Sequence, residues 1–237
     1  MPLGFKGNIL TTSAAFDGLI TQGATVTNNN MESSGQTNKF GGASLQCKVS
    51  NRWLQIDINS PSGGFEFKGS QAFTLEFWVN INWQANLNYE RELFRFATTT
   101  NANNRIKLTS GLGINFYTAN NYAQSATNLS QGTWSHLALV CRGNNTFDGY
   151  VDGTRYVTGA SFSTSGTKRF FIGGIGGDII GSNLNSYYDE LRISNTERYT
   201  GSSFSVPTSQ FTTDENTVTL FHFNFVSEGF LYDYAVD

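Results

Sequence analysis

Residues 134–157, WSHLALVCRGNNTFDGYVDGTRYV, decide the fold class. The first eight, WSHLALVC, form a nearly continuous apolar run, which is typical of a strand that is covered on both faces. Further on, Asp152-Gly153 separates two short runs of strand-forming residues. A type I′ turn needs two residues that tolerate a positive φ, so this dipeptide predicts a β-hairpin. The stretch therefore predicts a central strand followed by a hairpin.

Apolar and polar residues alternate along much of the remaining chain. In residues 72–79, Phe73, Leu75, Phe77 and Val79 share one face, which we expect to point into the core. Similar runs predict strands at residues 54–58, 114–117, 169–172, 187–193 and 218–225. No convincing helix longer than two turns is found, and no linker or internal repeat divides the chain. We expect an all-β protein with two antiparallel sheets in a single domain, residues 1–237.

The composition excludes several classes of protein. Of the 237 residues, 14% are aromatic and 14% charged, and the net charge is −3 without a run of like charges, which disfavours nucleic-acid binding. No apolar stretch has the length of a signal peptide or a membrane span, so we expect neither export by a signal peptide nor membrane insertion. The two cysteines, Cys47 and Cys141, lie in apolar segments and are interpreted as buried free thiols, with one disulfide as the alternative.

Six segments, taken in order, resemble the laminin-G-like, concanavalin A-like jelly-roll family. They are KFGGASL at residues 39–45, FTLEFWV at 73–79, WSHLA at 134–138, YVDG at 150–153, FIGG at 171–174 and YDELRIS at 188–194. The resemblance implies a two-sheet antiparallel jelly-roll sandwich. The sequence departs from the family at its N-terminus, where only Phe16-Asp17-Gly18 resembles the acidic segment that follows the usual first strand.

The segment of residues 198–223 resembles a version of this domain that is frequent in structural proteins of tailed bacteriophages, including those that infect cyanobacteria. It implies a non-catalytic virion module that decorates a capsid or tail or holds host surface glycans. Its partners would be other virion proteins, and a homo-oligomer such as a trimer is plausible. The alternative is a free-standing bacterial lectin-like protein. A secreted lectin needs a signal peptide, whereas a virion protein assembles inside the host, so the virion is the expected location.

Enzymatic chemistry is not supported by the carboxylates. Glycosidases need two carboxyl groups at a defined separation, and related retaining glucanases carry an E-x-D-x-E triplet that is absent here. Glu90 and Glu92 lack the third member and are interpreted as a surface charge pair beside Arg91. His136 and His222 lie in apolar runs and are interpreted as core residues. We expect no enzymatic activity.

Calcium is the one inorganic ligand that the resemblance implies. Many relatives hold it with an acidic residue of the N-terminal segment and the Asp of the DElRI strand, which are Asp17 and Asp189 here. Six to eight oxygen ligands are needed, so backbone carbonyls and water would complete the site. In the alternative, Asp189 and Glu190 form salt bridges with Arg192 or Arg198.

Two loops combine aromatic and amide side chains, which suit the C–H faces and hydroxyl groups of sugars. Residues 82–89, NWQANLNY, supply one combination, and the stretch around Asn121 supplies a smaller one. The candidate glycan-binding residues are Trp83, Asn86, Asn88, Tyr89, Asn121 and Tyr122. Solvated turns explain the asparagines equally well, because Asn tolerates turn conformations.

Overall fold

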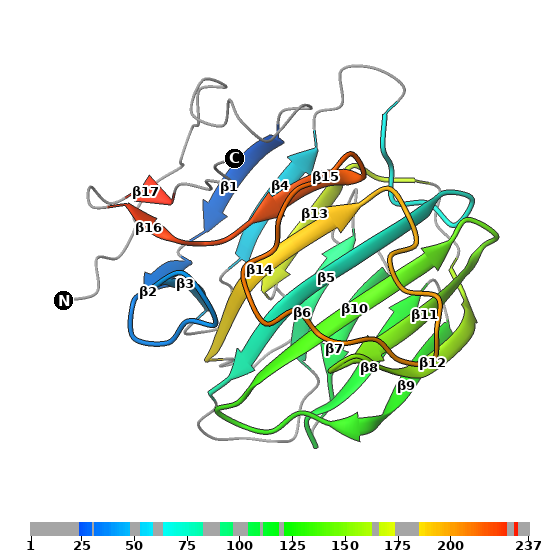
Figure 1. The fold of residues 1–237 in the computed structure, drawn as a ribbon, viewed down its shortest axis with the longest axis horizontal. Helices are drawn as coiled ribbons and strands as arrows, with labels where there is room; N and C mark the ends of the chain where they lie inside the picture. Colours follow the sequence, from blue (N-terminus) through cyan, green and yellow to red (C-terminus); the bar gives the residue numbers. More distant parts are fainter. Residues whose placement is uncertain are drawn as a thin grey trace.

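The computed structural model consists of two antiparallel sheets stacked face to face (Figure 1). It describes residues 24–29, 31–47, 53–58, 64–82, 91–96, 104–109, 111–118, 121–162, 166–173, 185–226 and 230–231. Every regular element within these ranges is a β-strand, and none of them contains a helix that could span a membrane. The all-β sandwich predicted from the sequence is confirmed.

The first sheet has seven strands in the order β1-β4-β13-β6-β7-β8-β9. Its strands are Ala24–Asn29 (β1), Trp53–Ile58 (β4), Arg169–Gly173 (β13), Arg91–Phe96 (β6), Asn104–Leu108 (β7), Gly113–Thr118 (β8) and Asn121–Asn128 (β9). Strand β4 is alternately buried and half-buried, as its sequence pattern predicts. One face of this sheet therefore packs on the core and the other is directed outward.

The second sheet has eight strands, with the path β12-β11-β10-β5-β14-β3-β2 and β15 added beside β14. Its strands are Thr154–Ser161 (β12), Thr146–Val151 (β11), Trp134–Arg142 (β10), Ala72–Ile81 (β5), Ser186–Ser194 (β14), Ser44–Cys47 (β3), Glu32–Ser34 (β2) and Thr217–Phe221 (β15). Two short strands, Phe225–Val226 (β16) and Phe230–Leu231 (β17), pair separately. Strands β10, β5 and β14 lie inside the sheet, and β10 is buried along most of its length, as predicted.

The core lies between the two sheets and is rich in phenylalanine. Phe73, Leu75 and Phe77 of β5 point into it and are at most 1% exposed. The Phe77 ring stacks on Phe94 of β6 with 6.0 Å between centroids. Aromatic pairs of this kind stabilise a core beyond the area that they bury. The two buried cysteines are free thiols, which confirms the first interpretation.

The hairpin predicted at Asp152-Gly153 joins β11 to β12. Asp152 has a φ of 47° and Gly153 a φ of 76°, which are the positive values that a type I′ turn requires. Gly153 also faces another segment: a Cβ built there would lie 2.3 Å from the carbonyl oxygen of Phe204. The turn therefore fits closely beneath residues that follow β14.

Residues 218–225 are not the single strand that their alternation predicts. Strand β15 ends at Phe221, and Phe223 has a φ of 55°. The reason lies in the neighbouring strand, where Glu190 has a φ of 52° and the pairing of β14 with β5 shifts its register at a β-bulge. Strand β15 pairs with β14 from Ser194 back to Leu191, the residue next to Glu190. The ladder therefore stops at the bulge.

The connection from β14 to β15, residues 195–216, is called the strap here. It crosses the outer face of the eight-stranded sheet, where Figure 1 draws it in orange. The N–H of Phe204 donates to the carbonyl of Gly153 at 2.8 Å, and the N–H of Arg155 donates to the carbonyl of Ser202 at 2.9 Å. Stacking of Tyr199 on Phe204, with centroids 3.5 Å apart, adds to this packing. The Thr74 hydroxyl of β5 donates to the carbonyl of Thr196, and Glu76 of β5 accepts from Tyr199, so the strap covers the outer face of β5 as well.

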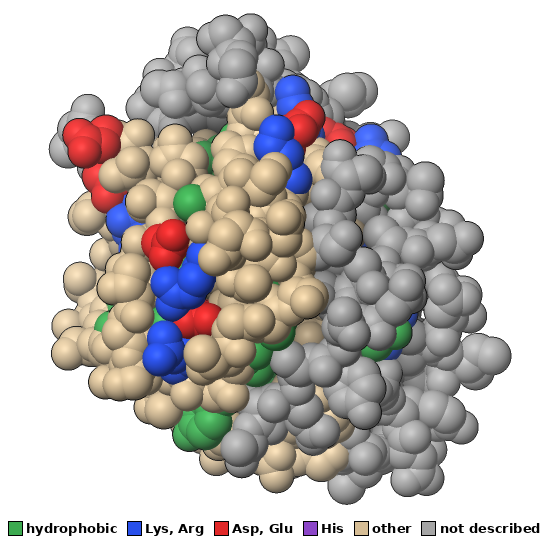
Figure 2. All heavy atoms as spheres, turned by 90° about the vertical axis from the view of Figure 1, so that its right-hand side faces the viewer, with side chains coloured by type: hydrophobic (Ala, Val, Ile, Leu, Met, Phe, Trp, Pro, Cys, Tyr) green, Lys and Arg blue, Asp and Glu red, His purple; other side chains and the backbone are tan. Residues whose placement is uncertain are grey.

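The described surface has little exposed apolar area. Figure 2 shows small groups of charged side chains of both signs and isolated apolar ones on the side that carries β9, β11 and β12. Among the described residues, Tyr156 of β12 is the one large hydrophobic side chain classed as exposed, at 38%.

Candidate functional site

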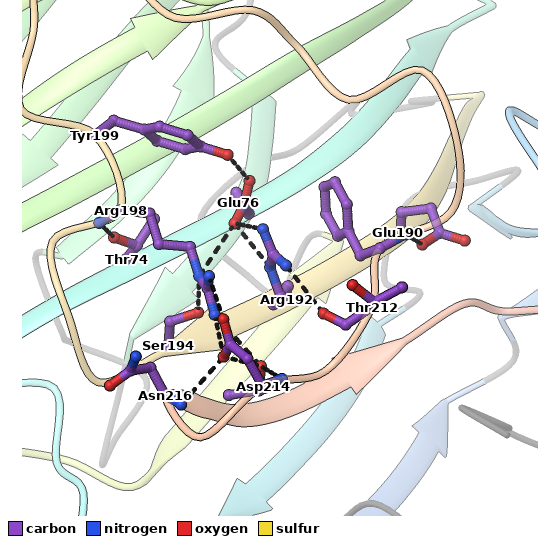
Figure 3. Close-up of polar contacts among 12 residues, drawn as sticks. Thr74, Glu76, Glu190, Arg192, Ser194, Arg198, Tyr199, Thr212, Asp214 and Asn216 are labelled. Atoms are coloured by element: carbon purple, nitrogen blue, oxygen red, sulfur yellow. Dashed lines mark hydrogen bonds and ion pairs between the residues drawn. The ribbon is translucent and has the colours of Figure 1, made fainter. Parts of the chain in front are cut away.

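Polar side chains gather on the outer faces of both sheets, and the first group lies beneath the strap (Figure 3). Glu76 of β5 is 0% exposed and lies at the centre of this group. Its Oε1 accepts hydrogen bonds from Nε and Nη2 of Arg192 at 2.9 and 2.8 Å. Its Oε2 accepts from the hydroxyl of Tyr199 at 2.7 Å and lies 3.2 Å from Nε2 of His136. Both carboxylate oxygens are thus engaged by the chain itself.

The electrostatics of this group favour a permanently ionised Glu76. Burial by itself would raise the pKa of Glu76, but the hydrogen bond with His136 and the charge of Arg192 lower it to about 2. Arg198, near the start of the strap, donates two hydrogen bonds at 2.8 and 2.7 Å to Asp214 near its end, which lowers the pKa of Asp214. The Glu76 carboxylate of β5 thus bonds both to Arg192 of β14 and to Tyr199 of the strap. The group fastens the strap to the sheet.

A second buried carboxylate, Glu190, sits at the bulge of β14. It accepts hydrogen bonds from the N–H of Phe211 at 2.7 Å and the amide of Gln210 at 3.2 Å. Nδ1 of His222 lies 2.8 Å from both of its oxygens. His136 and His222 are therefore both buried beside a carboxylate, which confirms that they are buried, although His136 lies beneath the strap and not in the core between the sheets.

The predicted calcium ligand Asp189 is buried on β14. Its Oδ2 accepts from the backbone N–H groups of Lys39 and Phe40 at 2.8 and 3.1 Å, and its Oδ1 accepts from the N–H of Glu190 at 2.9 Å. Burial raises its pKa to about 7, although these hydrogen bonds act in the opposite direction. The alternative, in which Asp189 and Glu190 form salt bridges with Arg192 or Arg198, is wrong. Arg192 pairs with Glu76, and Arg198 pairs with Asp214 and Glu76. Glu190 lies beside His222 instead.

Backbone N–H groups donate to both oxygens of Asp189, so its carboxylate already fastens the segment of Lys39 and Phe40 to β14. The described part of the chain also contains no group of three or more His, Cys, Asp or Glu side chains that could hold a metal ion. Asp17 lies outside the described residues, so the pair of Asp17 and Asp189 stays a prediction.

The outer face of the seven-stranded sheet carries a different set of residues. Strand pairing places one residue from each of six neighbouring strands in a line across the sheet, which we call the transverse row. In strand order it consists of Gln55 (β4), Phe171 (β13), Arg95 (β6), Arg105 (β7), Tyr117 (β8) and Tyr122 (β9). Residues directly opposite each other on paired strands share a face of the sheet. Amide, guanidinium and aromatic groups therefore follow one another along this line.

Glu92 lies beside the row, and its burial shows that the predicted surface charge pair was wrong for this residue. It is 2% exposed and is not part of a surface charge pair; Glu90 lies outside the described residues. Its carboxylate accepts hydrogen bonds from Nε and Nη2 of Arg95 at 2.7 and 2.5 Å, while Nη1 of Arg105 is 3.6 Å away. Burial raises the pKa of Glu92, although both arginines act in the opposite direction. The sequence places Glu92 next to Arg91, but the fold brings it to Arg95.

The centre of the row is partly exposed and contains unsatisfied polar atoms. The guanidinium of Arg105 and the ammonium of Lys107 each lie 5.2 Å from the centroid of the Tyr117 ring. Asn115 stands opposite Lys107 on the adjoining strand. Nε of Arg105 and Oδ1 of Asn115 are buried and have no hydrogen-bond partner in the structure. A donor and an acceptor therefore remain unused on the same face.

The predicted glycan-binding residues fall into two groups. Trp83, Asn86, Asn88 and Tyr89 lie outside the described residues. Asn121 and Tyr122 belong to β9, opposite Thr118 and Tyr117, so Tyr122 ends the transverse row. The predictions missed Arg105, Asn115 and Tyr117. The sequence does indicate that these three side chains point outward, because each alternates with apolar core residues along β7 or β8.

The family follows from a match over the central part of the chain. A model described as the concanavalin A-like lectin/glucanases superfamily matches residues 54–201, which is more than half of the chain. The protein belongs to this superfamily. The concanavalin A-like match covers the central strands of both sheets, including β7 and β8 of the transverse row. No curated protein sequence matches the chain.

Solved structures show the same concanavalin A-like fold at low sequence identity. The botulinum neurotoxin serotype D binding domain has a TM-score of 0.54 and 14% identity over 80% of this chain and 48% of its own. The binding domain of Paraclostridial Mosquitocidal Protein 1 gives 0.56 and 13%, over 75% and 45%. A Trypanosoma rangeli sialidase mutant displaying trans-sialidase activity gives 0.56 and 12%, over 84% and 31%. The chain spans less than half the length of each, and the likeness shows the fold alone.

Proposed function

We propose that this protein is a non-catalytic glycan-binding module whose binding surface is the transverse row. The observation that carries the proposal is the placement of Arg105 and Tyr117 opposite each other at the centre of this row, with Lys107 and Asn115 beside them on the same two strands. Within this row Arg95 and Phe171 are buried, whereas Gln55, Arg105 and Tyr117 are partly exposed. We therefore place the sugar at the Arg105–Tyr117 end of the row.

The chemistry of the row suits sugars. Aromatic rings offer apolar faces for the C–H surfaces of a pyranose, and amide and guanidinium groups hydrogen-bond its hydroxyl groups. Membership of a superfamily of lectins and glucanases supports the same class of ligand. The similar botulinum C/D mosaic structure is described as a receptor binding domain, which supports a binding role for the fold.

The carboxylates support binding over hydrolysis. A glycosidase needs an acid and a second carboxylate about 5–5.5 Å or 6.5–9.5 Å apart. Glu92 is the carboxylate beside the centre of the row, and Arg95 holds both of its oxygens. A carboxyl group that is locked in a two-bond ion pair is poorly placed to exchange a proton with substrate.

A glycan array followed by isothermal titration calorimetry tests the proposal. The variant Tyr117→Ala removes the ring at the centre of the row, and Tyr156→Ala removes an exposed tyrosine on the other sheet as the control. We expect the Tyr117 variant to bind its best glycan at least about tenfold more weakly, and the control to match the wild type. An array without a binder, or unchanged affinity in the Tyr117 variant, would refute the proposal.

We further propose that the module works in a tailed-phage virion, as an oligomer bound to other virion proteins. The support is the resemblance of residues 198–223 to phage structural proteins. Mass spectrometry of gradient-purified particles should detect the protein. Finding it in the lysate of infected cells and never in particles would reject this setting and favour the alternative of a free-standing lectin-like protein.

A further inference from the structure

We propose that the outer face of the seven-stranded sheet holds an anion subsite at Arg105, so that the glycan is an acidic one, with a carboxylate or sulfate group. The glycan part of this inference rests on the proposed function. The subsite itself is argued from the hydrogen bonds of Arg105 and its neighbours.

The first step is that two neighbouring arginines differ in how closely they bind the Glu92 carboxylate. Arg95 gives two short hydrogen bonds to Glu92 and is 1% exposed. Arg105 stands opposite Arg95 on the next strand, and its nearest atom to the same carboxylate, Nη1, is 3.6 Å away. Its side chain is 17% exposed. Arg105 is thus the arginine of this pair whose side chain is partly exposed to solvent, with Nε on its buried edge.

The second step is the unsatisfied donor. Nε of Arg105 is buried without a hydrogen-bond partner, and leaving a buried charged donor unbonded is costly. Nε and the adjacent Nη2 form the guanidinium edge that binds an oxyanion through two parallel hydrogen bonds. An anionic group placed at this edge would satisfy the buried donor.

The third step concerns the neighbours of this edge. Arg105 and Lys107 are two residues apart on β7 and therefore lie on the same face of the sheet, and the Tyr117 ring lies beside both of them. Oδ1 of Asn115, opposite Lys107, is a buried acceptor without a donor. An acidic sugar offers both complements, because its anionic group accepts from Arg105 and a hydroxyl donates to Asn115. A neutral sugar can donate a hydroxyl to Asn115 but has no anionic group to accept from Arg105.

Nuclear magnetic resonance of the Arg Nε–H groups tests the subsite directly. Three matched probes are galacturonate, galactose 6-sulfate and galactose. We expect the Arg105 Nε–H signal to shift with the two acids and not with galactose, and the stronger of the two shifts identifies carboxylate or sulfate. A signal that none of the three moves, or that galactose moves equally, overturns the subsite.

Calorimetry with oligogalacturonate and its methyl ester separates the subsite from the proposed function. Wild type should bind the acid at least about tenfold more tightly than the ester, and Arg105→Gln should remove this preference. Arg155→Gln is the control, because Arg155 has a similar exposure of 22% but lies on the other sheet and pairs with Asp148. Thermal melts confirm that both variants fold.

The outcomes are distinguishable. Equal affinity for acid and ester, unchanged in Arg105→Gln, rejects the anion subsite and leaves glycan binding standing. If the glycan array finds no binder, the proposed function fails, and the Nε–H titration alone decides the subsite.

Discussion

Replacing Glu76 by Gln should remove the negative charge that the strap and β14 bind, while the size of the side chain stays the same. The carboxylate is 0% exposed and contacts Arg192, Tyr199 and His136. Its pKa of about 2, against an ordinary value of 4.5, differs by about 2.5 units, and each unit is equivalent to about 1.4 kcal/mol. The ionised form therefore contributes roughly 3 kcal/mol to stability. Removing one partner of a buried pair costs about 3–5 kcal/mol, which is consistent.

Urea unfolding at pH 7 measures this loss, and an acid titration gives its sign. Because the folded pKa lies below the unfolded one, the contribution is complete above about pH 4.5 and disappears as the pH falls towards 2. Wild type should lose this stability on acidification, and Glu76→Gln should lack that part of the dependence. Glu66→Gln is the control, since its side chain is 36% exposed and 3.5 Å from Lys68. A Glu76 variant within about 1 kcal/mol of wild type, which is the range of an exposed surface ion pair, would refute the reasoning.

Three further outcomes are expected. Gly153→Ala should destabilise the protein to urea more than Gly159→Ala, because both have a positive φ but only Gly153 has a backbone atom within 4 Å of the new Cβ; equal losses would show that the strap contact is irrelevant. Asp189 has a folded pKa of about 7 above its ordinary 3.8, so wild type should gain melting temperature as the pH falls from 7 to 4; Asp189→Asn should reduce this slope, and an unchanged slope would contradict the assignment. If Asp17 and Asp189 hold calcium, chelation lowers the melting temperature, and superimposable melts would reject that pair.

The parts of the fold that were predictable depend on neighbours in the sequence. Alternation identifies β4 and β8, and the φ requirements of a tight turn locate the hairpin at Asp152-Gly153. The strand predicted for residues 218–225 failed because its end is set by the bulge at Glu190, about thirty residues earlier. A local pattern cannot contain that information.

The candidate site shows the same limit. Alternation gives the outward positions of Arg105 and Tyr117 within their own strands, but not which strands lie side by side. The transverse row depends on the order β13-β6-β7-β8-β9 and on its register. Glu92 was assigned to the surface because charged residues are seldom fully buried unless they are paired. Its partner, Arg95, became apparent only when the bulge at Glu92 in β6 was known.

The position of β5 in its sheet has a consequence for how the chain is made. Strand β5 (Ala72–Ile81) is paired on one side by Trp134–Arg142 and on the other by Ser186–Ser194. During synthesis from the N-terminus, one edge of this long apolar strand has no partner until the ribosome has passed residue 194. Unpaired edges readily recruit other chains. Nascent chains that stall before β14 should therefore depend on chaperones, and truncation there should give inclusion bodies rather than a smaller folded domain.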